Sequence, residues 1–341
     1  MADAAARIVF DHVTKRYPGR AAPAVDDLTL TVPAGEICVL VGPSGGGKTT
    51  AMKMVNRLVD MTEGDIRIGD ESVRDRDVTE LRRGIGYVIQ QTGLFPHMTV
   101  AENVATVPRL LGWRSGVIDE RVDELLDLVE LPAEDYRDRF PSQLSGGERQ
   151  RVGLARALAA DPPVMLMDEP FSAVDPIVRH QLQEELLRLQ RDIGKTIVFV
   201  THDIDEAIKL GDNVAVLKVG GKLAQFAPPA ELLANPVDDF VRGFVGQDRG
   251  YRALTFVHPD ELPVKPLPPE LALKDGVPVG WRNGSAETLL PVGAVFKRGD
   301  SLRAALDSVL TSPSGLGVCV DDEGRAIGVV DQGTVAEALR P

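Results

Sequence analysis

Residues 42–49 read GPSGGGKT and fit the phosphate-binding pattern G-x-x-x-x-G-K-[ST]. The run before them, residues 37–41, is short, apolar and rich in β-branched side chains, as expected of a strand buried on both faces. The stretch after them, residues 49–58, carries apolar side chains at helical spacing. A strand, a glycine-rich turn and a helix in this order predict an α/β fold with a phosphate site at the start of the helix.

The glycines of this loop let backbone N–H groups converge on phosphate oxygens, and the N-terminus of the following helix favours negative charge. In this setting Lys48 is expected to reach the β- and γ-phosphates of a nucleotide, and Thr49 to ligate Mg²⁺. The alternative is a chance glycine-rich turn, and the flanking strand and helix count against it. The residues expected to bind phosphate are Gly42, Pro43, Ser44, Gly45, Gly46, Gly47, Lys48, Thr49 and Thr50.

An acidic pair, Asp168 and Glu169, ends a second apolar run at residues 164–167. At the carboxyl edge of a parallel sheet Asp168 can hold Mg²⁺ through water, and Glu169 can polarise the attacking water as a general base. Taken alone, an apolar strand ending in two carboxylates is usually a strand that meets solvent. The phosphate-binding loop upstream in the same chain favours the catalytic interpretation.

Residues 144–151 read LSGGERQR and open a helical segment at about 148–160, which gives the chain a second helix start that can face phosphate. A single subunit does not need two phosphate-facing helix starts to bind one nucleotide. Two subunits that face each other would need both, because each could lend its second helix start to the nucleotide of the other. With the phosphate-binding loop and the acidic pair, this run resembles the ATP-binding-cassette (ABC) ATPases. The resemblance extends over roughly two-thirds of the chain and implies ATP and Mg²⁺ as the bound groups.

The resemblance implies roles for residues that are uninformative alone. Ser145, Gly146, Gly147 and Gln150 would bind the ATP of the opposite subunit of a homodimer, and Asp175, in the run SAVD, would lie where two cassettes touch. The usual third residue of that run is Leu, and here it is Val174.

Three further residues match family positions around the nucleotide. Gln90 would contact Mg²⁺ and the attacking water, and it is preferred to the neighbouring Gln91 because it directly follows an apolar strand. His202 would sense the γ-phosphate, and Tyr17 would stack on adenine. A lone His after a strand or a Tyr near one is more often a surface or packing residue.

Composition limits the partners. The formal net charge is −13, which argues against a nucleic-acid backbone. No apolar run approaches the length of about 18 residues that spans a bilayer, and the N-terminus lacks the features of a signal peptide. Cys38 and Cys319 form no ligand pattern and suit a reducing compartment. We expect a cytoplasmic protein that reaches the membrane only through a partner.

The 341 residues predict two domains. Residues 1–246 form the expected ABC nucleotide-binding domain, a P-loop (RecA-like) α/β fold with a helical subdomain at about 92–158. Residues 247–290 are proline-rich and fit either a linker or a degenerate first copy of the last domain. Residues 291–341 follow the order strand–helix–strand–strand–helix and resemble a small α/β CBS domain. Asp331 and Thr334 replace that family's nucleotide-contacting residues, so a dimer-stabilising role and a sensor are equally open.

A single cassette without coiled-coil, zinc-binding or membrane segments fits the ATPase subunit of an importer, located at the cytoplasmic face of the membrane beneath permease subunits. The loop at 92–103 resembles the surface that receives a permease. Residues 49–58, 87–97 and 167–176 resemble the ATPases of osmoprotectant importers, which take up glycine betaine, carnitine, choline or proline and work indirectly with a substrate-binding protein. The alternatives are an importer ATPase for another small solute such as an amino acid, and a soluble ABC ATPase that acts on a macromolecule.

Overall fold

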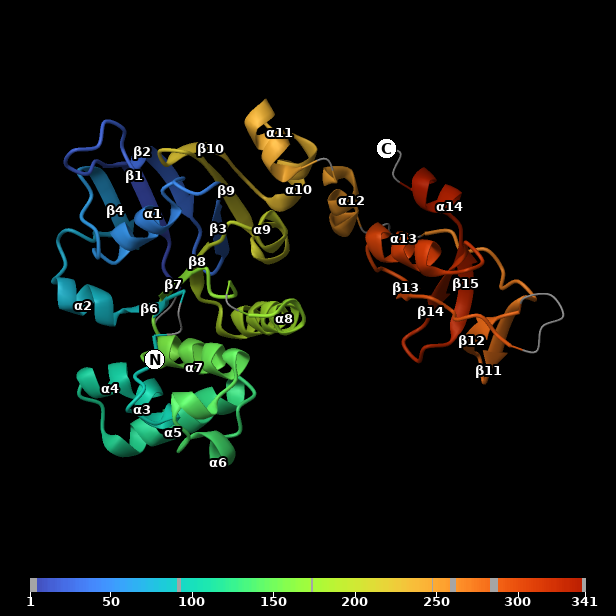
Figure 1. The fold of residues 1–341 in the computed structure, drawn as a ribbon, viewed down its shortest axis with the longest axis horizontal. Coiled ribbons are helices and arrows are strands. Elements are labelled where there is room, and N and C mark those ends of the chain that lie inside the picture. Colours follow the sequence, from blue (N-terminus) through green and yellow to red (C-terminus); the bar gives the residue numbers. More distant parts are fainter. Residues whose placement is uncertain are drawn as a thin grey trace. The chain divides into compact units, whose positions relative to one another are not determined.

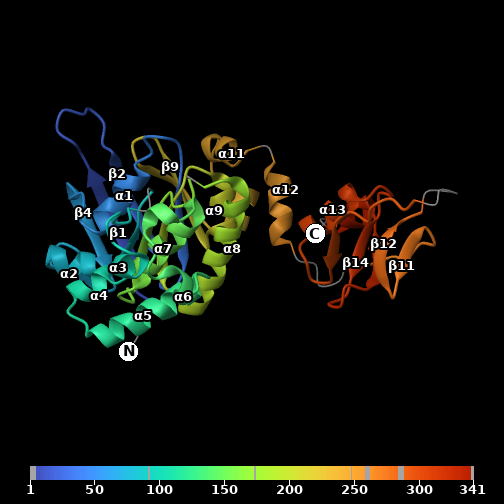
Figure 2. The same cartoon turned by 60° about the horizontal axis from the view of Figure 1, so that its bottom comes forward.

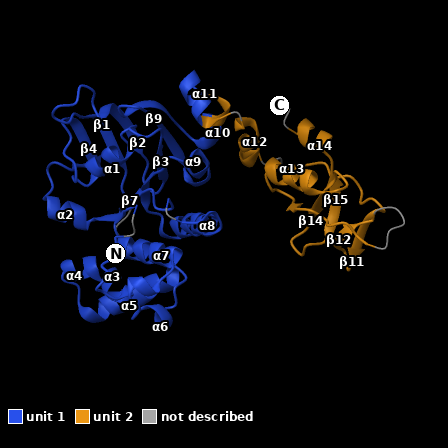
Figure 3. Ribbon diagram, viewed as in Figure 1, with its two compact units in different colours: residues 1–232, 236–244 blue, residues 233–235, 245–341 orange. Residues whose placement is uncertain are grey.

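The structure, a computed structural model, describes residues 5–90, 93–172, 174–246, 248–257, 262–282 and 288–338. The chain forms two compact units (Figures 1 and 3). The first contains residues 1–232 and 236–244, and the second contains residues 233–235 and 245–341. Within the described residues, no helix has the length and apolar character that would let it cross a bilayer.

The centre of the first unit is a six-stranded sheet in the order β10-β9-β3-β8-β7-β6. Its strands are parallel except for β10, which pairs antiparallel with β9. Every residue of β3, β7 and β8 is buried, because helices cover both faces of the sheet and leave no place for polar side chains. The strands are β3 (Ile37–Val41), β6 (Ile85–Val88), β7 (Val164–Asp168), β8 (Thr196–Val200), β9 (Asn213–Lys218) and β10 (Lys222–Ala227). The apolar run at 37–41 thus forms a strand with the predicted bounds.

Helices connect these parallel strands, as the alternation of apolar runs and amphipathic stretches predicts. The phosphate-binding loop leads from β3 into α1, which begins at Lys48 rather than Thr49. The long helix α8 runs from β7 to β8, and α9 from β8 to β9. The helices of this region are α1 (Lys48–Val55), α2 (Val78–Arg83), α8 (Pro176–Ile193), α9 (Ile204–Leu210), α10 (Pro229–Ala234) and α11 (Asp239–Val245).

A second, antiparallel sheet has the order β2-β1-β4-β5. Its inward side chains, such as Phe10 and Ile66, belong to the same buried cluster as Leu40 and Val200 of the central sheet. One apolar core is therefore shared by the two sheets, with the phosphate-binding helix between them. The strands are β1 (Ile8–Lys15), β2 (Val25–Val32), β4 (Glu63–Ile68) and β5 (Glu71–Ser72).

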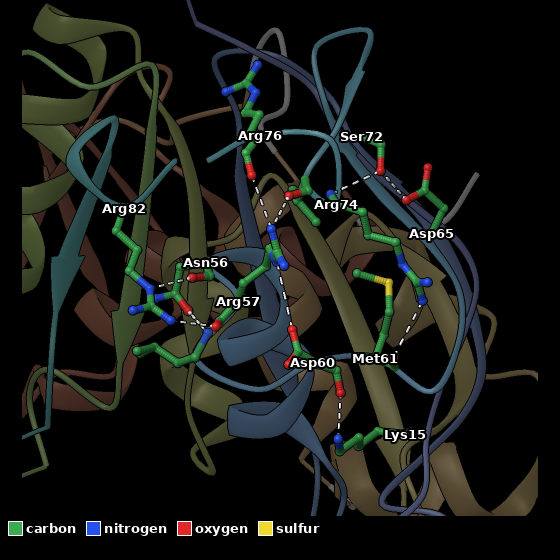
Figure 4. A network of polar contacts seen from close by, with 12 residues as sticks. Lys15, Asn56, Arg57, Asp60, Met61, Asp65, Ser72, Arg74, Arg76 and Arg82 are labelled. Atoms are coloured by element: carbon green, nitrogen blue, oxygen red, sulfur yellow. Dashed lines mark hydrogen bonds and ion pairs between the residues drawn. The ribbon is translucent and has the colours of Figure 1, made fainter. Parts of the chain in front are cut away.

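Arginine side chains hold the far end of α1 (Figure 4). Arg82 donates to the carbonyl oxygens of Asn56 and Arg57 at 3.1 and 2.6 Å, and Arg57 donates to the carbonyl oxygens of Val73 and Arg76. Carbonyl groups at a helix C-terminus lack partners within the helix, and cationic donors there also suit the helix dipole. These contacts tie α1 to α2 and to the loop after β5.

Five α-helices and a short 3-10 turn make up the helical part of the first unit, which gathers on the side away from the antiparallel sheet (Figures 1 and 2). The elements are α3 (Val100–Val104), α4 (Thr106–Leu110), α5 (Ser115–Leu128), α6 (Ala133–Tyr136), η1 (Pro141–Gln143) and α7 (Gly146–Leu158). Thr99 and Glu102 form a capping box at the start of α3, and Ser145 and Glu148 form one at α7. The expected start of this region, at 92, lies outside the described residues.

The second unit contains the predicted order strand–helix–strand–strand–helix. Strand β13 pairs parallel with β14, and β14 pairs antiparallel with β15. Helix α13 supplies Leu302, Ala305 and Val309 to a small apolar core. The elements are α12 (Arg249–Ala253), η2 (Leu254–Phe256), β13 (Val295–Lys297), α13 (Leu302–Thr311), β14 (Gly317–Val320), β15 (Ala326–Val330) and α14 (Gln332–Glu337).

The proline-rich stretch contains more structure than its composition suggests. Strands β11 (Leu271–Lys274) and β12 (Val277–Trp281) form a hairpin, and Lys265 pairs with Val329 of β15. Trp281 is 2% exposed and belongs to a buried cluster with Leu271 and Val329. A free linker, one of the two expectations for 247–290, therefore does not describe residues 262–282. The burial of Trp281 outweighs the poor strand propensity of the surrounding prolines.

Candidate functional site

Two glycines give the phosphate-binding loop its shape. Gly42 has φ 154° and Gly47 has φ 74°. A Cβ on Gly42 would lie 2.2 Å from the Leu217 carbonyl oxygen, and one on Gly47 would lie 2.2 Å from that of Ala24. Only glycine fits where another backbone approaches so closely. The loop is therefore enclosed by β9 and by the segment that enters β2.

Lys48, the first residue of α1, is 7% exposed. Its Nζ donates to the carbonyl oxygens of Gly42 and Pro43, at 2.7 and 3.0 Å. Burial lowers the pKa of Lys48, and the carboxylates of Glu169 and Asp168 oppose that shift. The ammonium group is thus held across the mouth of the loop, close to two carboxylates.

Thr49 and Asp168 meet although they are far apart in sequence. The Thr49 hydroxyl donates to Asp168 Oδ1 at 2.9 Å. Asp168 ends β7 and is 7% exposed, and burial raises the pKa of its carboxyl group. A hydroxyl and a carboxylate together form an oxygen donor set suited to Mg²⁺.

Glu169 follows directly and has φ 44°, a left-handed conformation that is uncommon outside glycine. Its backbone N–H donates to the Val200 carbonyl oxygen at 2.9 Å. Its Oε2 lies 3.2 Å from Gln90 Nε2 and 3.3 Å from His202 Nδ1. Two side chains, from the ends of β6 and β8, therefore converge on the Glu169 carboxylate at the end of β7. Backbone strain of this kind is often found at functional sites.

These groups surround one open pocket in the first unit. Its lining joins the loop and the start of α1 to the ends of β7 and β8. The residues are Ser44, Gly45, Gly46, Gly47, Lys48, Thr49, Thr50, Glu169 and His202. Glycine N–H groups, a lysine, a hydroxyl and a carboxylate can together bind a polyphosphate and direct a water molecule towards it.

Tyr17 does not line this pocket, although its segment lies near the loop. Its half-buried ring has the Lys15 ammonium at 5.0 Å and the Arg20 guanidinium at 5.8 Å from its centre. These distances are within the range of cation–π contacts.

The LSGGERQR run contributes nothing to this chain's own pocket, since none of its residues lines it. Ser145 and Gly146 are exposed at the start of α7, and Gly147 is partly covered by Val178. Gln150 is 5% exposed and lines a narrow apolar cavity beneath α7. The structure thus places Gln150 in the interior, because its position one helical turn beyond the exposed end faces α8 rather than solvent.

Asp175 caps α8, and its carboxylate accepts from the N–H groups of Ile177 and Val178 at 3.1 and 3.2 Å. The residue before Val174 lies outside the described residues.

Asn103 organises the loop before α3, a role not expected from sequence. It is fully buried, accepts from Phe95 N–H at 2.7 Å, and donates to the carbonyl oxygens of Phe95, Met98 and Thr99. A second unexpected group is Glu206, a buried carboxylate that contacts the residue before His202. For Asn103 and Glu206 alike, the only signal in the sequence was a polar residue at a position that faces the core.

Comparison with known proteins agrees with this geometry. A family model described as ABC transporter matches residues 25–172. The osmoprotectant import ATP-binding protein OsmV of Salmonella typhimurium is 43% identical over 367 residues, covering 97% of this chain and 96% of that protein. The carnitine transport ATP-binding protein OpuCA of Listeria monocytogenes is 55% identical over 240 residues, covering 70% of this chain and 60% of OpuCA.

A solved structure is also similar. The ATP-binding cassette MJ0796, in a dimeric post-hydrolysis state bound to ADP and Pi, is 34% identical and superposes with a TM-score of 0.58. That match covers 65% of this chain and 98% of the cassette. The resemblance to osmoprotectant-importer ATPases is thereby confirmed, as is the cassette fold. The chain belongs to the ATP-binding subunits of ABC transporters, enzymes that bind ATP with Mg²⁺ and hydrolyse it.

Proposed function

We propose that this chain energises the import of a compatible solute such as glycine betaine, carnitine, choline or proline. The observation that carries the proposal is the similarity to OsmV, because it extends through both units and covers 97% of this chain. OpuCA supports the same class of solute, although the chain spans only about 60% of that relative's length. The solute itself would never touch this subunit.

In the proposed site the chain binds the nucleotide through residues 42–50. Glycine N–H groups hold phosphate oxygens, and the Lys48 ammonium turns from its carbonyl partners to the β- and γ-phosphates. Thr49, Asp168 and Gln90 would hold Mg²⁺, whose charge offsets that of the phosphates. Tyr17 supplies the aromatic face for adenine.

Glu169 acts in this scheme as the general base. Its carboxylate faces the pocket, accepts from Gln90 and lies beside His202, so a water held among these groups would be polarised towards phosphorus. His202 orients the carboxylate and donates to the γ-phosphate. The strained backbone at Glu169 keeps that side chain directed into the pocket.

The second half of each site comes from a second copy of the chain. Ser145 and Gly146 are exposed at a helix N-terminus that no nucleotide in the same chain would reach. Two such faces, joined by two ATP molecules, complete two sites, with Gly147 adding a further N–H group and Asp175 lying at the contact. Gln150 supports the turn from beneath.

The permease binds on the helical side in this proposal, which places the chain at the cytoplasmic face of the membrane. A groove lies between the sheet and the helical part, and its lining includes Tyr87, Phe95 and Val107. Phe95 is 40% exposed, and buried Asn103 fixes its backbone. An exposed aromatic side chain on a rigid loop suits a partner helix.

For the second unit we propose a CBS-like domain that does not bind nucleotide through Asp331 and Thr334. The Asp331 carboxylate accepts from both the N–H and the hydroxyl of Thr334, at 2.8 and 2.9 Å, and pairs with Lys265. The Asp331 carboxylate and the Thr334 hydroxyl therefore already have hydrogen-bond partners within the second unit.

The transport proposal is tested by uptake of labelled glycine betaine after osmotic upshift. Cells that lack the gene are complemented with wild type or with Glu169→Gln. Uptake restored by wild type alone supports both the transport role and the class of solute. Normal uptake without the gene contradicts the proposed solute, and the neighbouring genes then decide between another importer and a soluble ATPase.

The site proposal predicts that Glu169→Gln nearly abolishes ATP hydrolysis and leaves an ATP-bound dimer. The amide cannot take a proton from water, while nucleotide binding does not depend on it. Steady-state ATPase rates and size-exclusion chromatography with ATP measure the two effects. A fall in kcat of less than about tenfold, or about 1.4 kcal/mol of barrier, would show that Glu169 is not the base.

A further inference from the structure

A buried polar network lies directly behind the turn that carries His202. The Glu206 carboxylate accepts from the Thr201 hydroxyl at 2.6 Å and from the Gln183 amide at 3.1 Å. Thr201, Gln183 and Glu206 are 2, 6 and 7% exposed. They come from the end of β8, from α8 and from α9, so the network joins three elements of the first unit.

The Thr201 hydroxyl links the network to the turn after β8. Its Oγ1 accepts from the Asp203 N–H at 3.0 Å, and the hydroxyl donates to Glu206. The Thr201 N–H donates to the Leu40 carbonyl oxygen of β3 at 3.2 Å. The residues on both sides of His202 are thus held by a backbone bond to the central sheet and by a hydroxyl bonded to a buried carboxylate.

Stability alone does not account for this arrangement. Burial raises the pKa of Glu206 and Asp203 adds to the shift, while Thr201, Gln183 and Arg179 act against it. Placing a carboxylate in the interior costs free energy, and well-packed apolar side chains in its place are often as stable. Thr201, at one end of the network, directly precedes His202 in the chain, and His202 Nδ1 lies 3.3 Å from Glu169 Oε2.

We propose that Thr201, Glu206 and Gln183 are positioning residues that hold His202 against Glu169 and the γ-phosphate. The inference rests on the role proposed above for His202. Gln183 lies on α8, the helix that Asp175 caps, so the network also connects the expected subunit contact to the histidine turn. Small displacements of a catalytic group cost rate rather than nucleotide affinity.

The test is steady-state ATP hydrolysis by the full-length protein carrying Thr201→Val. This change keeps the shape of the side chain and removes the hydroxyl. We expect kcat to fall about tenfold or more with KM for ATP within about twofold, because the site is misaligned rather than lost. Thr201→Ser restores the hydroxyl and is expected to recover kcat. Gln183→Met acts at the far end of the network and is also expected to lower kcat. It replaces Thr201→Val in the test if that variant does not fold.

A matched control uses the same strand. Thr196 is also fully buried, and its hydroxyl accepts from Gly35 N–H at 2.9 Å at the other end of β8. Thr196→Val therefore removes a buried hydroxyl without touching the histidine turn, and kcat is expected to stay at the wild-type value. An equal loss of kcat in the two valine variants would overturn the inference, since it would reflect damage to the strand.

A double-mutant cycle separates this inference from the proposed site. If the network acts through His202, Thr201→Val costs nothing further in a His202→Ala background. The same fold-loss in both backgrounds would overturn the positioning role while leaving the catalytic site intact. Wild-type hydrolysis by His202→Ala alone would instead remove the role of His202, and the inference with it.

Discussion

At the scale of single residues, the phosphate-binding loop depends on which neighbour lies beside each glycine. Gly45 and Gly47 both have left-handed φ values, 79° and 74°. A Cβ on Gly45 meets nothing within 4 Å, whereas one on Gly47 would lie 2.2 Å from the Ala24 carbonyl oxygen. The pattern G-x-x-x-x-G-K-[ST] requires glycine at position 47 but not at position 45, and the different surroundings of the two residues give the physical reason.

Gly47→Ala and Gly45→Ala therefore form a matched pair. Both pay the cost of a left-handed alanine, about 1–2 kcal/mol, and only Gly47→Ala adds a clash with rigid backbone. We expect Gly47→Ala to lower Tm more and to lose ATP affinity, measured by calorimetric titration. Equal effects on Tm and affinity would contradict the close approach seen at Gly47.

At the scale of elements, α1 is held at both ends. Its start carries Lys48 and Thr49 in the site, and its far end is held by Arg82 and Arg57 (Figure 4). Because the helix is only eight residues long, its own hydrogen bonds give little independent stability, and its position depends on such tertiary contacts.

Arg82→Met keeps the aliphatic stem and removes the two donors to the end of α1. We expect a loss of about 1–2 kcal/mol in the free energy of unfolding, since of the two hydrogen bonds removed the one to Arg57 is exposed and the one to Asn56 is partly buried. Chemical denaturation of the first unit measures the change. Arg82→Lys, which keeps one charged donor, should lose less; an equal loss would mean that the stem, not the donors, matters.

A second element, α14, carries a pH-dependent contact at its start. Lys265, together with the Thr334 N–H and hydroxyl, holds the pKa of Asp331 well below its usual range. A depressed folded pKa contributes stability above the unfolded value, about 3.9, and that stability is lost as pH falls through the folded pKa.

Asp331→Asn keeps a helix-capping side chain but removes the charge. We expect it to lower the Tm of the second unit at pH 7, followed by calorimetry. The gap from wild type should narrow as pH falls from about 4 towards the folded pKa, because the unfolded chain binds its proton in that window while the folded carboxylate is still ionised. A gap that stays constant down to pH 2 would show that Lys265 does not stabilise the ionised form.

At the scale of the whole molecule, every residue of the proposed ATP site belongs to the first unit, and the second has its own apolar core. The proposed site of ATP hydrolysis and the second unit therefore belong to separate parts of the chain. The second unit can influence hydrolysis only by acting on the first or on a partner.

Removing residues 250–341 tests this separation. We expect basal ATP hydrolysis to persist, because every proposed catalytic residue remains, and its dependence on ionic strength to change. The measurement is ATPase rate against salt concentration for the full and shortened chains. Identical salt profiles would leave the second unit a structural role only.

Much of this arrangement could be predicted from sequence. Strands buried on both faces need continuous apolar runs, so β3 was predicted with its observed bounds. The hairpin within the proline-rich stretch could not, because Trp281 finds its buried partners only after the chain has folded back on β15. The same holds for Gln150, whose burial depends on how α7 packs.

The chemistry of this protein can be read from its amino-acid sequence, because a glycine-rich loop, an acidic pair and a second helix start are local patterns whose function follows from residue type and spacing. Tertiary structure alone decided which groups meet. Thr49 meets Asp168 although the two are distant in the chain, and the network behind His202 joins separate elements. The left-handed backbone of Glu169 likewise appears only in the folded chain. Local propensity cannot specify such contacts, because they are fixed by the packing of helices on a shared core.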